Sequence, residues 1–202
     1  MLFEFIRPSK AAIRELPIFK GLSLTAITLV SNDAELAQAR LTLEECDHIG
    51  FDTESKPTFK KGEVSDGPHV IQLASSDHAF LFTAHFLPGI ELALSILVNS
   101  RIKKYGFGLG DDRRLFLKKY GVTLSSLVDL AKVLKHAGDL KQDVGARAGV
   151  AMLFQQRLSK SVQRSNWSQY PLSDRQVKYA ANDAYAGICI ANQLMALGVS
   201  IE

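Results

Sequence analysis

Apolar residues fall into short runs in the first half of the chain and into helical repeats in the second half. Runs rich in β-branched and aromatic residues predict strands at about 25–30, 49–54, 69–74, 78–82 and 101–107. Spacings of three and four residues predict helices at about 34–46, 88–98, 112–120, 127–134, within 144–158 and from 173 to the end. Because most strands precede most helices, we expect an α/β fold with helices packed on a mixed central sheet.

Residues 1–20 mix charged and apolar side chains and lack the uninterrupted apolar core of a signal peptide. We expect them to form an extension that packs on the domain or frays. Residues 21–202 are long enough for one domain with a sizeable core. No apolar run approaches the ~18 residues needed to cross a membrane, so no membrane partner is expected.

The composition is ordinary for a globular protein, with 47% hydrophobic and 22% charged residues. A formal net charge of +3 is compatible with a nucleic-acid partner but does not require one. The two cysteines, Cys46 and Cys189, form no C-x-x-C motif, which argues against a zinc site or a disulfide framework. We therefore expect a reducing intracellular compartment, cytoplasmic or nuclear.

Two carboxylates, Asp52 and Glu54, stand at the end of the predicted strand 49–54. Residues two apart on a strand point to the same face, so these acids lie side by side. Two like charges held that close are unfavourable unless a cation lies between them, and oxygen ligands suit Mg²⁺ or Mn²⁺. A solvated strand end is the alternative interpretation.

A third carboxylate, Asp183, lies in the predicted last helix, which begins with a capping box formed by Ser173 and Gln176. A helical projection places Asp183 on an apolar side of the helix, one turn after Tyr179. A buried carboxylate needs a cation or several hydrogen-bond donors. A simple Tyr–Asp hydrogen bond that stabilises the helix is an equally good explanation.

The segment from Gly106 to Asp112 ends with two acids, Asp111 and Asp112, at the start of a predicted helix. Its glycines allow something bulky to approach the backbone closely. Carboxylates at a helix N-terminus also stabilise the helix dipole without any further role. Only one of the two acids needs to face a site, and the residues alone do not decide which.

Taken together, these segments resemble the DEDD superfamily of 3′–5′ exonucleases, in the tyrosine-bearing branch with RNase D and Werner-type domains. Asp52-Thr53-Glu54 resembles the first motif, Gly106 to Asp112 the second, and Tyr179 to Asp183 the third, Tyr-x-x-x-Asp. The segment from Leu158 to Trp167 resembles the family segment before its last helix. The resemblance runs from about residue 25 to the C-terminus and implies an RNase H-like fold.

The resemblance implies a metal-dependent exonuclease that removes nucleotides from the 3′ end of DNA or RNA. In the second motif the catalytic Asp follows the Leu by three residues, which selects Asp112 over Asp111. Asp52, Glu54, Asp112 and Asp183 would then hold two Mg²⁺ or Mn²⁺ ions, and Tyr179 would orient the attacking water. The sequence does not indicate an oligomeric state.

Two other interpretations of the function stay open. A non-catalytic nucleic-acid-binding module could have the same fold, and an unrelated phosphodiesterase could cleave small nucleotides. Near the last helix, Arg157, Lys160 and Arg164 could contact phosphates. Trp167 could stack on a base, but a role in the core is favoured. Since no second nucleic-acid-binding domain follows, we expect this domain or a partner to bind the substrate.

Overall fold

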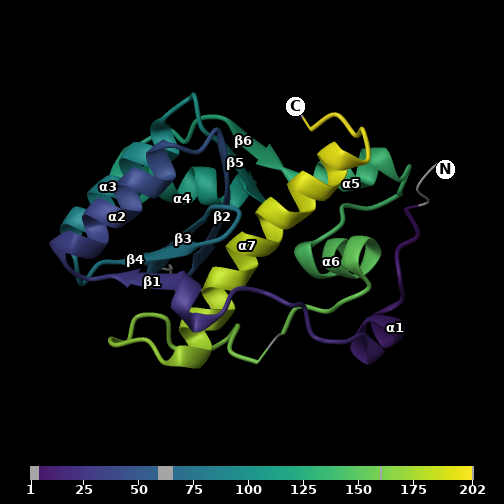
Figure 1. Ribbon diagram of the computed structural model, residues 1–202, viewed down its shortest axis with the longest axis horizontal. Helices are drawn as coiled ribbons and strands as arrows, with labels where there is room; N and C mark the ends of the chain where they lie inside the picture. The colour runs from purple at the N-terminus through teal and green to yellow at the C-terminus, as the bar shows by residue number, and fades with distance from the viewer. Residues whose placement is uncertain (1–4, 59–65, 160, 202) are drawn as a thin grey trace.

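A six-stranded mixed sheet forms the centre of the computed structural model, which describes residues 5–58, 66–159 and 161–201 (Figure 1). The strand order is β1-β4-β3-β2-β5-β6, with β3 antiparallel to its neighbours and the other pairs parallel. The α/β architecture predicted from the order of elements is therefore confirmed. The strands are β1 (Ile27–Val30), β2 (His48–Glu54), β3 (Val70–Ala74), β4 (Ala79–Thr83), β5 (Lys103–Gly106) and β6 (Leu127–Asp129).

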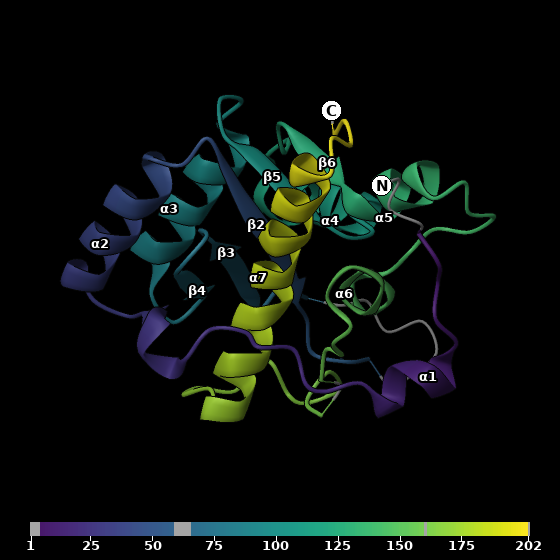
Figure 2. The same cartoon turned by 45° about the vertical axis from the view of Figure 1, so that its right-hand side comes forward.

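Helices cover both faces of this sheet. The long helix α7 crosses one face, and α5 and α6 lie beside it, while α2, α3 and α4 pack on the other face (Figures 1 and 2). Within the described chain, no helix has the length and apolarity to cross a membrane. The helices are α1 (Lys10–Glu15), the 3₁₀ turn η1 (Leu24–Ala26), α2 (Asp33–Glu44), α3 (Leu87–Val98), α4 (Gly110–Tyr120), α5 (Leu130–Ala137), α6 (Ala146–Phe154) and α7 (Asp174–Ala196).

The core consists of two apolar clusters, one on each face of the sheet. Along β3, Val70 and Ala74 belong to the cluster under α7, whereas Ile71 and Leu73 belong to the cluster under α2 and α3. Successive side chains of a strand point to opposite faces, so one continuous apolar strand supplies both clusters. Burial on both faces explains why the central strands appear in the sequence as uninterrupted apolar runs.

One predicted element is wrong. The helix expected at 127–134 is a short strand, β6, followed by the helix α5. Leu127 and Val128 pair in parallel with Lys104 and Tyr105 of β5. The side chain of Asp129 then accepts a hydrogen bond from the backbone N–H of Ala131 at 3.1 Å and caps α5. Three residues are too few to show a strand period, and the pairing with β5 decides their conformation.

Three of the other helices have capping residues at one end, and the capping box predicted for the last helix is confirmed. In α7 the Ser173 hydroxyl and the Gln176 side chain form the reciprocal capping box. Helix α4 ends at Gly121, whose φ of 68° is left-handed. Helix α2 begins after Asn32, whose side chain accepts from the N–H of Glu35. These local signals place helix ends within a few residues.

Candidate active site

Helix α7 approaches the sheet closely because both surfaces present glycine. A Cβ at Gly50 of β2 would lie 1.9 Å from the carbonyl oxygen of Ala184, and one at Gly187 would lie 2.8 Å from that of Tyr105. No residue with a side chain fits at Gly50 without moving the helix. This contact brings Asp183, next to Ala184, toward Asp52, which lies two residues beyond Gly50 on the same face of β2.

Three of the predicted acids converge at this junction. One carboxylate oxygen from each of Asp52, Glu54 and Asp183 lies within 4.8 Å of the other two. Asp52 and Glu54 come from the end of β2, and Asp183 comes from the middle of α7. Within the described ranges, none of the ion pairs includes any of these three acids. The arrangement is thus a compact group of carboxyls that forms no ion pair with a basic side chain of the described residues.

Burial and mutual repulsion both oppose ionisation of this group. Burial is the main cause that raises the pKa of Glu54 to about 9, and the charge of Asp52 adds to it. Burial also raises the pKa of Asp183 to about 6 and that of Asp52 well above its usual range, with Asp183 and Asp112 contributing to Asp52. A divalent cation would offset the repulsion, and the all-oxygen donor set fits Mg²⁺ or Mn²⁺.

The fourth predicted acid, Asp112, lies outside the group of three but next to it. It stands in the first turn of α4, and its Oδ1 accepts a hydrogen bond of 2.7 Å from the Thr53 hydroxyl. Burial raises its pKa. Asp111, in contrast, has a side chain that is 88% exposed and forms an ion pair with Arg114. The geometry favours Asp112 over Asp111 as the acid that serves the site.

In the segment from Gly106 to Asp112, Gly106 and Gly108 allow backbone contacts within the fold. The sequence alone instead predicts that these glycines allow the close approach of a bulky group. A Cβ at Gly106 would lie 2.6 Å from the carbonyl oxygen of Phe51, so the close neighbour is the adjacent strand. Gly108 has a φ of 67° and therefore a left-handed backbone. Its N–H donates to the Asp129 carboxylate at 3.0 Å. These contacts set the turn that leads into α4 and Asp112.

Tyr179 lies one turn before Asp183 on α7, and its hydroxyl is hydrogen-bonded to the Asp183 carboxylate. Burial, followed by the charge of Asp183, raises the pKa of the phenol. The hydroxyl therefore stays protonated at neutral pH and donates rather than acting as a base. The ring of Trp167 lies 5.9 Å from the ring of Tyr179, and Trp167 is 1% exposed, which confirms its predicted role in the core.

Two further residues of the site were not predicted. The guanidinium of Arg147, on α6, lowers the pKa of both Asp183 and Tyr179. Gln72 is fully buried directly opposite Asp52 in the strand register, and neither atom of its amide has a hydrogen-bond partner among the described residues. A lone amide within the apolar strand 69–74 is a signal that could have identified Gln72, whereas nothing in the sequence around Arg147 marks it.

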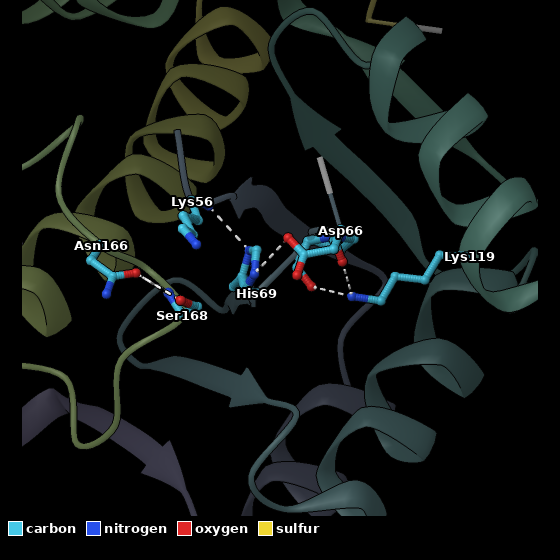
Figure 3. A network of polar contacts seen from close by, with 7 residues as sticks. Lys56, Asp66, His69, Lys119, Asn166 and Ser168 are labelled. Carbon is cyan, nitrogen blue, oxygen red and sulfur yellow. Dashed lines mark hydrogen bonds and ion pairs between the residues drawn. The ribbon is translucent and has the colours of Figure 1, made fainter. Parts of the chain in front are cut away.

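The chain beyond Glu54 is held by polar contacts around His69 (Figure 3). The N–H of Lys56 donates to Nδ1 of His69 at 3.1 Å, so Nε2 carries the proton that faces Asp66 at 3.2 Å. The ammonium of Lys119 donates to the carbonyl oxygens of Asp66 and Pro68. These contacts give His69 a structural role beside the acids. Residues 59–65 of the same segment, and Lys160, lie outside the described residues.

Comparison with known proteins agrees with this fold. Residues 27–198 match the family model of the 3′–5′ exonuclease domain. The chain is 23% identical to the Nibbler EXO domain of Aedes aegypti, with a TM-score of 0.72 over 89% of this chain and 93% of that one. RNase D of Escherichia coli gives 24% identity and a TM-score of 0.70 over 85% and 44%. The fold is thus that of an RNase H-like exonuclease domain.

The chain belongs to the 3′–5′ exonuclease family. It is 32% identical over 161 residues to the mouse bifunctional 3′–5′ exonuclease/ATP-dependent helicase WRN. The aligned region covers 78% of this chain and 12% of the mouse protein. A 3′–5′ exonuclease of Arabidopsis thaliana is 29% identical over 141 residues, 68% of this chain and 49% of that protein. The chain thus spans at most about half the length of these relatives.

Proposed function

We propose that this protein removes nucleotides from the 3′ end of a nucleic acid by hydrolysis that depends on divalent ions. The observation that carries the proposal is the convergence of Asp52, Glu54 and Asp183 within 4.8 Å. Membership of the 3′–5′ exonuclease family supports the reaction and the dependence on a divalent metal. We assign residues 21–202 to the exonuclease domain and residues 1–20 to an extension.

We propose that Asp52, Glu54, Asp112 and Asp183 hold two ions, Mg²⁺ or Mn²⁺. When bound, such ions lower the pKa of a water and offset the charge on the scissile phosphate. The protonated phenol of Tyr179 would hold the attacking water in line with the phosphate, as in the tyrosine-bearing branch of the family. Thr53 would hold the Asp112 carboxylate in position through its 2.7 Å hydrogen bond.

The proposed substrate is the 3′ end of DNA or RNA. An RNA substrate is supported by ribonuclease D of Haemophilus influenzae, which is 28% identical over 120 residues, whereas the name of the WRN relative specifies neither nucleic acid. The unpaired thiols of Cys46 and Cys189 favour a reducing intracellular compartment. Matched DNA and RNA strands of one sequence, digested side by side, would distinguish the two substrates.

The test is digestion of a 5′-labelled single strand with Mn²⁺ by the wild type and by the Asp52→Ala variant. The proposal predicts a ladder that shortens from the 3′ end for the wild type and an intact strand for the variant. Binding without shortening would instead favour the non-catalytic module. Cleavage of dinucleotides alone would favour the phosphodiesterase of small nucleotides. Asp47→Ala, a change before the start of β2, is the control that should leave the ladder intact.

A further inference from the structure

The N-terminal segment takes a defined path past the candidate active site. Residues 5–22 lie outside the matched family region, 27–198. The segment runs from α1 along α6 and crosses α7 before it enters η1 (purple in Figures 1 and 2). It thus lies on the same side of the sheet as Tyr179 and Asp183.

Hydrogen bonds fix this segment to the domain. The backbone around Arg157 pairs with it, since the N–H of Phe19 donates to the Arg157 carbonyl at 2.9 Å and the N–H of Arg157 donates to Pro17 at 2.8 Å. Nε of Arg157 donates to the carbonyl of Leu16 at 2.8 Å. The N–H of Leu22 donates to the side chain of Asn182 at 2.8 Å. The last contact ties the segment to the residue next to Asp183.

Two neighbouring cavities open between the segment and the domain. The smaller, of about 370 Å³, is lined by Phe19, Lys20 and Gly21 from the segment and by Tyr179 and Asp183 from α7. The larger, of about 630 Å³, lies between α1 and α6. Leu158 lines both cavities. The larger cavity is therefore a neighbour of the one that contains the predicted catalytic residues.

The larger cavity is strongly basic. Among the described residues that line it there is no acid, and its five cationic side chains are Arg7, Lys10, Arg14, Arg147 and Arg157. Its remaining lining is mostly apolar, with Pro8, Ile13, Ala146, Ala148 and Leu158. Concave walls that carry one sign of charge concentrate ions of the opposite sign, and guanidinium groups bind phosphate oxygens in pairs. Its volume lies within the ordinary range of ligand sites.

We propose that this basic cavity binds the sugar–phosphate backbone of the nucleotides that precede the 3′-terminal one. The inference rests on the proposed function and makes the N-terminal segment part of the substrate site. Leu158 lines both this cavity and the one at the acids, so a strand whose 3′ end lies at the acids would reach the basic cavity with the nucleotides that precede it. The N-terminal segment lines both cavities, with Arg14 in the basic one and Lys20 in the one at the acids, so the two regions lie close together.

The test compares two double variants in the whole chain. Arg7→Gln with Arg14→Gln removes two exposed charges from the cavity. As the control, Arg101→Gln with Lys103→Gln removes two exposed charges at the start of β5. The start of β5 pairs with the start of β2, so these two residues lie at the opposite end of the strands from the acids. The substrates are a single strand of about twelve nucleotides, within the span of single-strand sites, and the p-nitrophenyl ester of thymidine 5′-monophosphate.

The cavity variant should lose about tenfold in kcat/KM on the strand, mainly through KM, as expected for two lost phosphate contacts. Its slope of log(kcat/KM) against log[salt] should fall by about 1.4, at ~0.7 for each phosphate contact on a single strand. Its rate on the ester should not change, because the ester has no preceding nucleotide. The control variant should match the wild type on both substrates.

Wild-type kinetics of the cavity variant on the strand would overturn the inference, and so would an equal loss on strand and ester. Fluorescence anisotropy of the labelled strand separates this failure from failure of the proposed function. If the wild type binds the strand but never shortens it, the proposed exonuclease activity is wrong. If the cavity variant then binds the strand about tenfold more weakly than the wild type, the proposed role of the cavity still holds. Binding of inorganic phosphate alone, with strand affinity unaffected by the substitutions, would also overturn the inference.

Discussion

The hydroxyl of Thr53 donates a 2.7 Å hydrogen bond to Oδ1 of Asp112. Thr53 lies between Asp52 and Glu54 on β2 and points to the opposite face of the sheet from them. One short strand end therefore supplies two acids on the side of α7 and holds a third acid, from α4, on the other side. This arrangement makes the end of β2 the centre of the site.

Substitution of the two neighbouring acids of α4 should give opposite results. Asp112→Asn should lower kcat/KM for the labelled strand by about a hundredfold or more, because a half-buried carboxylate beside the acid group is lost. Asp111→Asn should stay within about twofold of the wild type, since that side chain is exposed and pairs only with Arg114. Steady-state digestion measures both, and a larger effect at Asp111 would contradict the assignment.

Thr53→Val should act through Asp112. Loss of the hydroxyl removes a hydrogen bond that lowers the pKa of Asp112, so that pKa should rise. We expect a loss of about tenfold in kcat, and an activity profile whose acidic limb moves to higher pH. Thr53→Ser, which keeps the hydroxyl, should restore both the rate and the profile. A loss in Thr53→Ser as large as that in Thr53→Val would contradict the role of the hydroxyl, because Thr53→Ser keeps it.

The metal-free protein should become less stable as the pH rises. The pKa of Asp183 is raised to about 6 and that of Glu54 to about 9, so the folded protein binds more protons than the unfolded chain. Their contribution to the free energy of unfolding is complete below about pH 4 and is lost as the pH rises through about 6 and then about 9. Saturating Mg²⁺ should raise the melting temperature more at about pH 9 than at about pH 5. A Mg²⁺ effect that does not change with pH would contradict the stated ionisation.

Asp52→Asn should separate stability from activity. Replacing one of three crowded, buried carboxyls by an amide removes the cost of ionising it beside the other two, so the metal-free variant should melt a few degrees above the wild type, or about 1 kcal/mol. The same variant should be inactive and should show little stabilisation by Mg²⁺. Thermal melts with and without the ion measure both effects, with Asp47→Asn as the control. An increase in melting temperature with Mg²⁺ equal to that of the wild type would place the ion elsewhere.

Tyr179→Phe tests the role of the phenol. The ring stays in its place against Trp167, so the melting temperature should change little. Because the hydroxyl would orient water in the reaction and not hold the strand, kcat should fall by about a hundredfold while KM stays within about threefold. A fall in kcat/KM that comes from KM alone would assign the hydroxyl to substrate binding.

Much of the fold followed from local signals in the sequence. The central strands are buried on both faces and so appear as apolar runs, and helix ends carry capping residues such as Ser173 and Gly121. The strand β6 was missed because its conformation depends on pairing with β5, a contact between segments more than twenty residues apart. Local periodicity has no access to such a contact.

The site divides in the same way. Asp52 and Glu54 were placed together by strand geometry alone, and Asp183 by the apolar side of its helix. The choice between Asp111 and Asp112 needed the resemblance or the structure, because it depends on the orientation of α4 against Thr53. The basic cavity could not be predicted, since Arg7 and Arg147 lie 140 positions apart and meet only through the path of the N-terminal segment.

The central claim is that the acids at the junction of β2 and α7 hold divalent ions beside a 3′ end. Anomalous diffraction from a crystal soaked in Mn²⁺ with a short single strand tests it most directly. We predict a manganese peak bound by Asp52, Glu54 and Asp183, with the 3′-terminal phosphate of the strand beside it. A strand bound elsewhere, or manganese peaks away from these carboxylates, would contradict the account.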